Sequence, residues 1–221
     1  MVTRNQARAG LAAPGSAPPG SAPPGGSEPG PRRRRADARR NVDALIEAAR
    51  TVFATSGVDA PAKEITDLAG VGVGTLYRHF PQRADLVKAV VESGIDAVAD
   101  AGPALSAAHE SAEALTRWIE RFTELLATKR GLASALHSGD PAFSGLPGYF
   151  FQRLGPALAA LLDAAVADGT VRGDISAEDL LHAITQLSQP VPGRGPEHNQ
   201  RTVAVLVDGL RCRATRQPPP R

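Results

Sequence analysis

Residues 70–81 combine small, hydroxyl-bearing and basic side chains at the spacing of one short helix. The guanidinium of Arg78 can donate to a guanine, and the methyl group of Thr75 can meet the methyl group of a thymine. Polar groups on Thr75, Tyr77 and His79 can also bind phosphate oxygens. The stretch therefore predicts recognition of DNA. The residues expected to face a DNA groove are Val73, Gly74, Thr75, Tyr77, Arg78 and His79.

Base contacts and phosphate contacts are expected from different parts of this stretch. The first half of the helix, residues 73–75, is expected to read bases, joined by Arg78. Gly74 permits the backbone to approach the groove closely. Arg83 lies in the first turn of the next helix, where a positive charge opposes the helix dipole, so a phosphate partner is predicted for it. The residues predicted to contact phosphates are Thr75, Tyr77, His79 and Arg83.

Two short helices and a glycine turn must position these side chains. Ile65, Leu68 and Ala69 mark the apolar side of a helix over residues 61–69, and residues 73–79 form the second helix. Gly70 between them can adopt a positive φ at no steric cost. Two short helices joined at a steep angle by such a turn form a helix-turn-helix. Its small core is expected to hold Ile65, Ala69, Val71 and Leu76.

A longer helix is predicted to precede this pair. Apolar residues recur at three- and four-residue steps between Val42 and Phe53, so the helix should cover residues 37–56 and end at Gly57. Residues 1–36 hold Ser-Ala-Pro-Pro-Gly repeats and four consecutive arginines, and are predicted to be a disordered tail. The basic run is either a solvated linker or an arm that neutralises phosphates or enters the minor groove. On the second interpretation Arg39 and Arg40 also contact DNA.

Residues 41–86 resemble the N-terminal domain of the TetR (tetracycline repressor-like) transcriptional regulators. The family's AA…F…G pattern is matched by Ala48, Ala49, Phe53 and Gly57. Its IA…AGV…GTLYRHF…K…L signature is matched by Ile65, Ala69, Gly70, Val71, Gly74, Thr75, Leu76, Tyr77, Arg78, His79, Phe80 and Leu86. The resemblance covers about one fifth of the chain. It implies that Tyr77 and His79 touch the DNA backbone.

Four positions depart from the family's pattern. Pro61 replaces a Thr that opens the second helix, although Pro suits a first helical turn. Thr66 replaces a small Ala, and Arg83 keeps the positive charge of a Lys. Gly72 replaces the Ser or Thr that caps the recognition helix, at a cost of roughly a few tenths of a kcal/mol. One phosphate contact that is usual in the family therefore lacks its hydroxyl group here.

The second half of the chain has helical periodicity throughout. Further helices are predicted over residues 83–100, 107–127, 129–137, 148–168, 177–189 and 197–216. Together with the resemblance, this predicts an all-α fold of about nine helices. A three-helix DNA-binding domain should cover residues 37–82, and a helical regulatory and dimerisation domain residues 83–216. Residues 217–221 are predicted to be a disordered tail.

The resemblance also implies a ligand pocket and a dimer interface in the second half. The pocket, for a small and largely apolar inducer, is expected at Trp118, Phe122, His137 and Phe150. The last two helices should pair with a second copy through Leu180, Ile184, Leu187, Val203, Leu206 and Leu210. Two reading helices at a fixed spacing would then read a palindromic operator. For each of these residues the alternative is ordinary packing within one subunit.

Composition and charge narrow the function classes. Hydrophobic residues make up 42% and aromatic residues only 4%, which favours a helical core of Ala, Leu and Val. Residues 1–90 carry a formal charge of +5 (13 Lys and Arg against 8 Asp and Glu) and the rest −3, as expected for a basic reading head on an acidic body. The single cysteine, Cys212, fits a reducing cytoplasm, and no secretory signal or membrane span is expected. No cofactor or metal is expected.

The leading hypothesis is a homodimeric repressor that a small molecule releases from its operator. An enzyme is the rival class, since His137, Ser138 and Asp140 lie close together in the sequence. Three residues of one loop rarely supply triad geometry, and no phosphate loop or nucleophile elbow is present in the sequence. The chain is therefore predicted not to be an enzyme. A protein that coats DNA without sequence preference is the remaining alternative.

Overall fold

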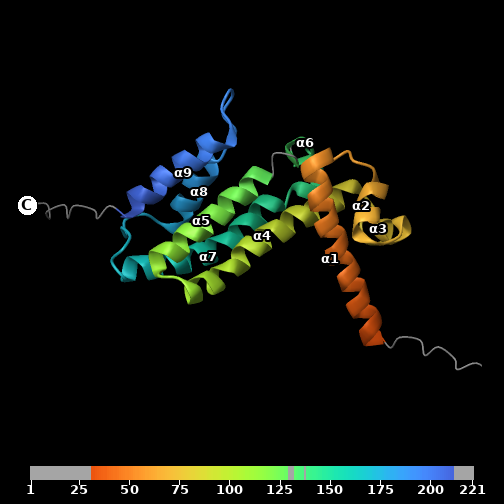
Figure 1. The fold of residues 1–221 in the computed structure, drawn as a ribbon, viewed down its shortest axis with the longest axis horizontal. Coiled ribbons are helices and arrows are strands. Elements are labelled where there is room, and N and C mark those ends of the chain that lie inside the picture. Colours follow the sequence, from red (N-terminus) through yellow and green to blue (C-terminus); the bar gives the residue numbers. More distant parts are fainter. Residues whose placement is uncertain (1–30, 129–131, 137, 212–221) are drawn as a thin grey trace, which may run out of the picture.

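The structure is a computed structural model that describes residues 31–128, 132–136 and 138–211, and every regular element in these ranges is a helix (Figure 1). The predicted all-α fold of about nine helices is confirmed. Residues 1–30 of the tail predicted for residues 1–36 lie outside the described residues, as do the tail predicted for residues 217–221, His137 and Cys212. The elements are α1 (Pro31–Ser56), α2 (Ala62–Ala69), α3 (Val73–His79), α4 (Arg83–Ala108), α5 (Ser111–Thr128), α6 (Ala133–Leu136), the 3-10 helix η2 (Pro141–Phe143), α7 (Leu146–Ala167), α8 (Ala177–Leu187) and α9 (Pro196–Arg211).

Helix α1 begins earlier than its apolar pattern predicts. It starts at Pro31, so residues 31–36 are helical where the sequence predicts a tail. Proline fits the first helical position and arginine is a good helix former, but neither supplies the apolar periodicity on which the prediction depends. The N-terminal turns of α1 extend beyond the rest of the N-terminal helices (Figure 1). They end in a solvent-facing stretch that holds Arg39 and Arg40.

The turn between α2 and α3 has the predicted conformation. Gly70 adopts a left-handed φ of 68°, and the N–H of Val71 donates to the carbonyl of Thr66 at 3.1 Å. Gly72 is extended, and its carbonyl accepts from the N–H of Thr75 at 2.8 Å. No side chain caps α3, as the missing Ser or Thr predicts. The glycines thus set the angle of α3, while Ile65 and Leu76 are buried and α2 packs on both α1 and α3.

Helix α4 is longer than the sequence predicts and continues from the N-terminal helices into the second half of the molecule. It runs through Pro103 to Ala108, whereas the periodicity predicts an end near residue 100. Pro103 is exposed, and Leu105 beyond it is buried, so packing of the following turn outweighs the hydrogen bond that proline removes. A capping box starts the helix, with the N–H of Gln82 donating to the Asp85 carboxylate at 3.0 Å.

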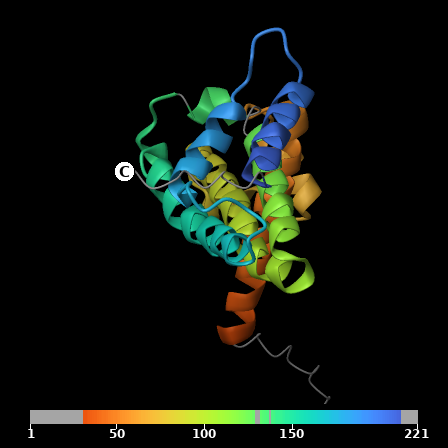
Figure 2. The same ribbon diagram turned by 90° about the vertical axis from the view of Figure 1, so that its left-hand side faces the viewer.

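Helices α4, α5 and α7 pack side by side and form the main core of the second half (Figure 1). Its fully buried side chains include Trp118 and Phe122 from α5 and Leu154 and Leu158 from α7. Helix α8 packs on α7 and α5, and α9 packs on α8 and α5 (Figure 2). The two last helices therefore lie at the opposite end of the molecule from α2 and α3.

Among the described residues one segment, Pro141–Ala167, is long and apolar enough to cross a membrane by length and composition alone. The core helix of a soluble protein passes the same test. Here the segment contains α7, whose Leu154 and Leu158 are fully buried against neighbouring helices. Its buried leucines therefore belong to the core, although only 33% of the apolar window is buried.

Candidate nucleic-acid interface and cavity

Helix α3 presents the face that the sequence predicts. Tyr77 is 54% exposed and Val73, Gly74 and Arg78 are also exposed, while Leu76 is buried. Thr75 and His79 are half-buried at the edges of this face. With about 3.6 residues per turn, Val73 stacks next to Tyr77 and Gly74 next to Arg78. The helix thus presents Val73, Tyr77 and Arg78 side by side to a groove, with open space above Gly74.

Leu68 of α2 does not lie in the core, contrary to the apolar side predicted for that helix. Its side chain is 57% exposed, whereas Thr66, two residues earlier on the same helix, is buried. The Thr66 hydroxyl is satisfied locally, since it donates to the carbonyl of Lys63 at 3.1 Å. An eight-residue helix shows too few turns for periodicity to fix the direction of its buried face.

Arg83 is held inside the N-terminal helical unit rather than directed at solvent. Its Nε donates to the carbonyl of Val58 at 2.5 Å, and its Nη2 donates to the carbonyl of Ala60. The guanidinium also lies 5.3 Å from the ring centroid of Phe53. The phosphate contact predicted for Arg83 is therefore replaced by a structural role: it fastens the loop before α2 to the start of α4.

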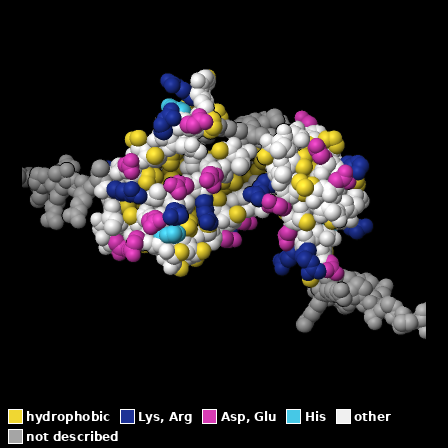
Figure 3. Space-filling model, in the orientation of Figure 1, with side chains coloured by type: hydrophobic (Ala, Val, Ile, Leu, Met, Phe, Trp, Pro, Cys, Tyr) yellow, Lys and Arg dark blue, Asp and Glu magenta, His cyan; other side chains and the backbone are white. Residues whose placement is uncertain are grey.

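Basic side chains lie at the free end of α1 and at the right-hand edge of the N-terminal helices (Figure 3). Arg39 and Arg40 are exposed on α1, and Arg40 forms an ion pair with Asp37 one turn earlier. The four preceding arginines belong to α1, but their side chains lie outside what the structure describes. Arg39 and Arg40 are therefore exposed and can contact DNA from α1, separately from α3.

The aromatic residues predicted to line a ligand pocket form solid core instead. Trp118 and Phe122 are fully buried, with ring centroids 5.6 Å apart, and Phe122 lies 5.6 Å from Phe150. The indole N–H of Trp118 donates to the carbonyl of Val98 at 2.9 Å, which joins α5 to α4. Large aromatic side chains bury the most surface and so fill the centre of a three-helix contact. The fourth predicted residue, His137, lies outside the described residues.

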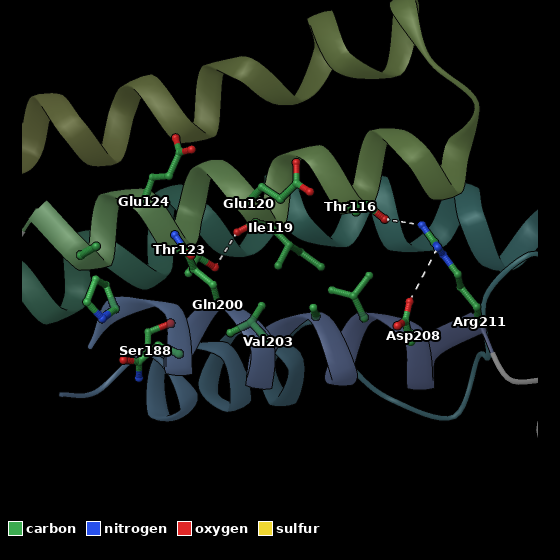
Figure 4. A pocket seen from close by; sticks show the side chains of 15 residues that line it. Thr116, Ile119, Glu120, Thr123, Glu124, Ser188, Gln200, Val203, Asp208 and Arg211 are labelled. Atoms are coloured by element: carbon green, nitrogen blue, oxygen red, sulfur yellow. Dashed lines mark hydrogen bonds and ion pairs between the residues drawn. The ribbon is translucent and has the colours of Figure 1, made fainter. Parts of the chain in front are cut away.

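A cavity of about 530 Å³ lies elsewhere, between α5 and α9 (Figure 4). Ile119 of α5 and Val203 and Val207 of α9 supply its apolar wall. At one end the guanidinium of Arg211 donates to the Thr116 hydroxyl at 3.0 Å and lies 3.8 Å from the Asp208 carboxylate. Sequence reasoning missed this site because polar residues such as Thr116 and Asp208 recur at the spacing of a solvated helix face.

Ser188 lines the other end of the cavity, where α8 stops. The residue is only 5% exposed, and its Oγ has no hydrogen-bond partner among the described residues. Asn199 of α9 binds the residues immediately before and after Ser188. Its side-chain amide donates to the carbonyls of Leu187 at 2.6 Å and Gln189 at 2.7 Å. The buried hydroxyl is thus fixed in place while its own hydrogen-bonding capacity stays unused within this part of the chain.

The residues predicted to form a dimer interface divide into two groups. Four of them are buried within the single chain: Leu180, Ile184, Val203 and Leu210. Within the single chain α8 packs on α5 and α7, and α9 packs on α8 and α5, so these four side chains are covered by its own helices. Leu187 and Leu206 are half-buried, and Val205 beside them is 72% exposed. Together with His198, Arg201 and Thr202, these three residues line a shallow depression on the outer side of α8 and α9.

A charged cluster ties α4 to α7. The Tyr149 hydroxyl donates to the Asp96 carboxylate at 2.6 Å, and Arg153 binds both Asp96 and Asp100, at 2.5 and 2.8 Å. Burial and the neighbouring Asp96 raise the pKa of Tyr149, so its hydroxyl stays protonated and keeps donating. The two carboxylates likewise raise the pKa of Arg153. Helix α4, which follows α3 in the chain, is therefore fixed to α7 by polar contacts as well as by buried apolar side chains.

Comparison with known protein families matches both halves of the chain. Residues 45–90 match the family of bacterial regulatory proteins called tetR, and this range contains α2, α3 and the turn between them. Residues 110–212 match the C-terminal domain of SbtR-like transcriptional regulators. The two matches thus cover the helix-turn-helix and the helical body that contains the cavity.

Two solved structures of TetR regulators resemble this chain over nearly the whole length of the solved chains. A TetR transcriptional regulator from Streptomyces coelicolor is 34% identical, with a TM-score of 0.65 over 77% of this chain and 98% of the other. A TetR regulatory protein from Mycobacterium vanbaalenii is 36% identical, with a TM-score of 0.63 over 80% and 99%. An HTH-type transcriptional regulator of Staphylococcus aureus is 35% identical over 68 residues, 29% of this chain, and the chain spans about a third (35%) of that relative's length. The chain belongs to the TetR family of transcriptional regulators, a family of DNA-binding proteins rather than enzymes.

Proposed function

We propose that the protein is a homodimeric repressor that binds a palindromic operator through α3 and leaves it when a small molecule binds. The observation that carries this proposal is the exposed face of α3, set at a fixed angle by the turn at Gly70. A helix of seven residues offers few base contacts, so specificity requires two copies at a fixed spacing. Sequence-specific binding by a dimer follows from that requirement.

In this proposal α3 lies in the major groove. Val73, Gly74 and Thr75 read bases from the first turn, with Arg78 reaching a guanine one turn later. Tyr77 and His79 bind phosphates on either side of the groove. Arg39 and Arg40 add phosphate contacts from α1, whereas Arg83 acts only by holding the loop before α2.

The dimer contact is proposed on the outer side of α8 and α9. Leu187, Val205 and Leu206 give this side an apolar centre, and His198, Arg201 and Thr202 give it a polar edge. An apolar centre within a polar rim is the usual anatomy of a protein interface. A two-fold axis through this surface would pair α8 and α9 with the same helices of the second copy.

Release from DNA requires a ligand that binds one arrangement of the dimer better than the other. Helix α4 is suited to transmit the difference, because it packs on α1 at one end and on α5 and α7 at the other. The boundary between a DNA-binding domain (residues 37–82) and a regulatory domain (residues 83–216) therefore falls at the start of α4 in this proposal. A regulator of this kind works where the chromosome is, which makes the cytoplasm its proposed location.

The test is selection of genomic fragments by the purified full-length chain under excess competitor DNA, followed by sequencing of the bound fragments. A short enriched palindrome is expected, with half-sites separated by about one helical turn of DNA or a multiple of it. A Thr75→Ala, Arg78→Ala variant serves as the control and should lose the enrichment. Enrichment of an asymmetric site would contradict the homodimer, and strong binding without enrichment would support a DNA-coating protein.

A further inference from the structure

The geometry points to the α5–α9 cavity as the effector site, and to an apolar organic cation as its ligand. This inference rests on the proposed function, since it names the class of small molecule that would release the repressor. It also moves the site away from the buried aromatic residues near Trp118 to a place where the structure leaves room.

Size and wall composition suit a small organic molecule. The volume of about 530 Å³ lies within the range of ligand pockets. The centre of the cavity is apolar, with Ile119 facing Val203 across the space between the helices (Figure 4), and Val207 also lines it. Lining residues extend along α9 from Pro196 to Arg211, which at a rise of about 1.5 Å per residue makes the cavity elongated. An extended apolar chain or a flat ring system fits that shape.

Charge at the cavity favours a cation. Three solvent-exposed carboxylates lie at its rim, where salt screens them, from Glu120 and Glu124 of α5 and from Asp208 of α9, against one guanidinium. That guanidinium, of Arg211, is already shared between Asp208 and Thr116. The lining therefore carries a formal charge of −2 on a chain whose net charge is +2. An anionic ligand would meet an excess of negative charge, whereas a cation would be attracted over an apolar wall.

The hydroxyl of Ser188 is the second observation that indicates a ligand. Buried polar groups in folded proteins almost always have a hydrogen-bond partner. Ser188 is nine-tenths or more buried, lines the cavity, and has none among the described residues. The Oγ itself is covered by protein atoms, so the serine side chain must rotate before a polar group of a ligand, at the end away from Arg211, can satisfy this hydroxyl. The site therefore favours an organic cation that carries a second, hydrogen-bonding group.

The cavity and the proposed dimer contact lie on different flanks of α9. Successive residues of a helix are rotated by about 100°, so Val205 and Leu206 lie on the α8 side of α9 while Ala204 and Asp208 lie on the α5 side. A ligand between α5 and α9 would thus change the separation of α9, which carries the proposed dimer contact, from α5, which packs on α4. Such a position connects ligand binding to the spacing of the two α3 helices.

Calorimetric titration of the full chain with three probes of equal length tests the ligand class: octylammonium, octanol and octanoate. Octylammonium should bind at least tenfold more tightly than octanoate, and raised salt should weaken it. A fourth probe, 8-amino-octanol, should bind more tightly than octylammonium, and Ser188→Ala should abolish that difference. Because the Ser188 hydroxyl has no partner to lose, the variant should remain as stable as the parent protein. Equal or tighter binding of octanol or octanoate would overturn the cationic class.

Variants test the location. Glu120→Gln combined with Asp208→Asn should weaken octylammonium about tenfold, and Ala204→Phe should block it by filling the cavity. The matched control is Glu178→Gln combined with Asp163→Asn, which removes two exposed carboxylates from α8 and α7 and should leave binding unchanged. Unchanged binding in the cavity variants would place the cation elsewhere and refute the site. Operator binding without probe is measured in parallel, so an enriched palindrome with no cation binding would refute this inference while the proposed function stands.

Discussion

At the scale of single residues, two arginines five positions apart have opposite surroundings. Arg78 is exposed on α3, whereas Arg83 gives its hydrogen bonds to the carbonyls of Val58 and Ala60 and lies over the ring of Phe53. The first is free to meet DNA, and the second stabilises the unit that presents α3. Both side chains end in guanidinium groups, so their different positions in the fold give Arg78 a proposed binding role and Arg83 a stabilising one.

Replacing each arginine should separate these two roles. Arg83→Ala leaves two loop carbonyls without a charged donor, so we expect a loss of roughly 1–3 kcal/mol in the free energy of unfolding, measured by urea denaturation. Arg78→Ala removes an exposed side chain and should change stability by less than about 0.5 kcal/mol, while it weakens operator binding. Equal stability of the two variants would contradict the structural role of Arg83.

Thr75 is expected to affect specificity rather than overall affinity. Thr75→Ala removes a hydroxyl and a methyl group from the first turn of α3, so preference should change at one or two base pairs, by about 1–3 kcal/mol for the favoured base. Binding to a series of single-base operator variants measures this. The comparison is Tyr77→Phe, which removes a proposed phosphate contact and should weaken all sequences alike. Uniform weakening by Thr75→Ala would show that it binds phosphate only.

The sequence predicts residue positions well where backbone conformation decides them, and poorly where packing decides them. Gly70 has the positive φ that the turn requires, and α3 presents the expected residues. The burial of Trp118 and the exposure of Leu68 depend on neighbours distant in the sequence, which a local pattern does not contain. The unpartnered hydroxyl of Ser188 is invisible in sequence for the same reason.

At the scale of elements, α9 illustrates how one helix serves several contacts. Its buried row, which includes Val203 and Leu210, packs within the chain, one flank borders the cavity, and the other flank carries Val205 and Leu206. Periodicity predicts that the helix is amphipathic, but not which partner covers which flank. The same limit applies to α4, whose continuation through Pro103 depends on the burial of Leu105.

A charge on the outer flank of α9 should separate the dimer without unfolding the subunit. Val205 is largely exposed in the single chain, so Val205→Arg should leave the helical circular dichroism spectrum unchanged. Burying an unpaired charge in the proposed interface should instead shift the protein from dimer to monomer in light scattering. Val191→Arg, on the loop before α9, is the control and should remain a dimer. A dimeric Val205→Arg protein would move the interface to another surface.

At the scale of the whole molecule, the proposed DNA-binding and ligand-binding surfaces are separated along the long axis. Helices α1 and α3 lie at one end, and α8 and α9 lie at the other (Figure 1). Helix α9 contributes to both the proposed interface and the cavity. Helix α4 packs on helices of both ends, with Asp96, Tyr149 and Arg153 fixing it to α7. A ligand between α5 and α9 can therefore affect DNA binding only through helix positions, since no lining residue belongs to α1, α2 or α3.

The salt dependence of DNA binding should report both the role of α1 and the number of subunits on the operator. Each phosphate neutralised by a basic side chain contributes about 0.9 to the slope of log affinity against log salt. If a dimer binds, Arg39→Ala removes two such contacts and should reduce the slope by about 1.8, whereas a monomer would lose about 0.9. Affinity should fall equally for operator and competitor DNA, because phosphate contacts carry no sequence information. Arg194→Ala, which removes an exposed arginine far from α1 in the sequence, is the control and should leave the slope unchanged. An unchanged slope for Arg39→Ala would show that this part of α1 does not touch DNA, and would assign its arginines to solvent.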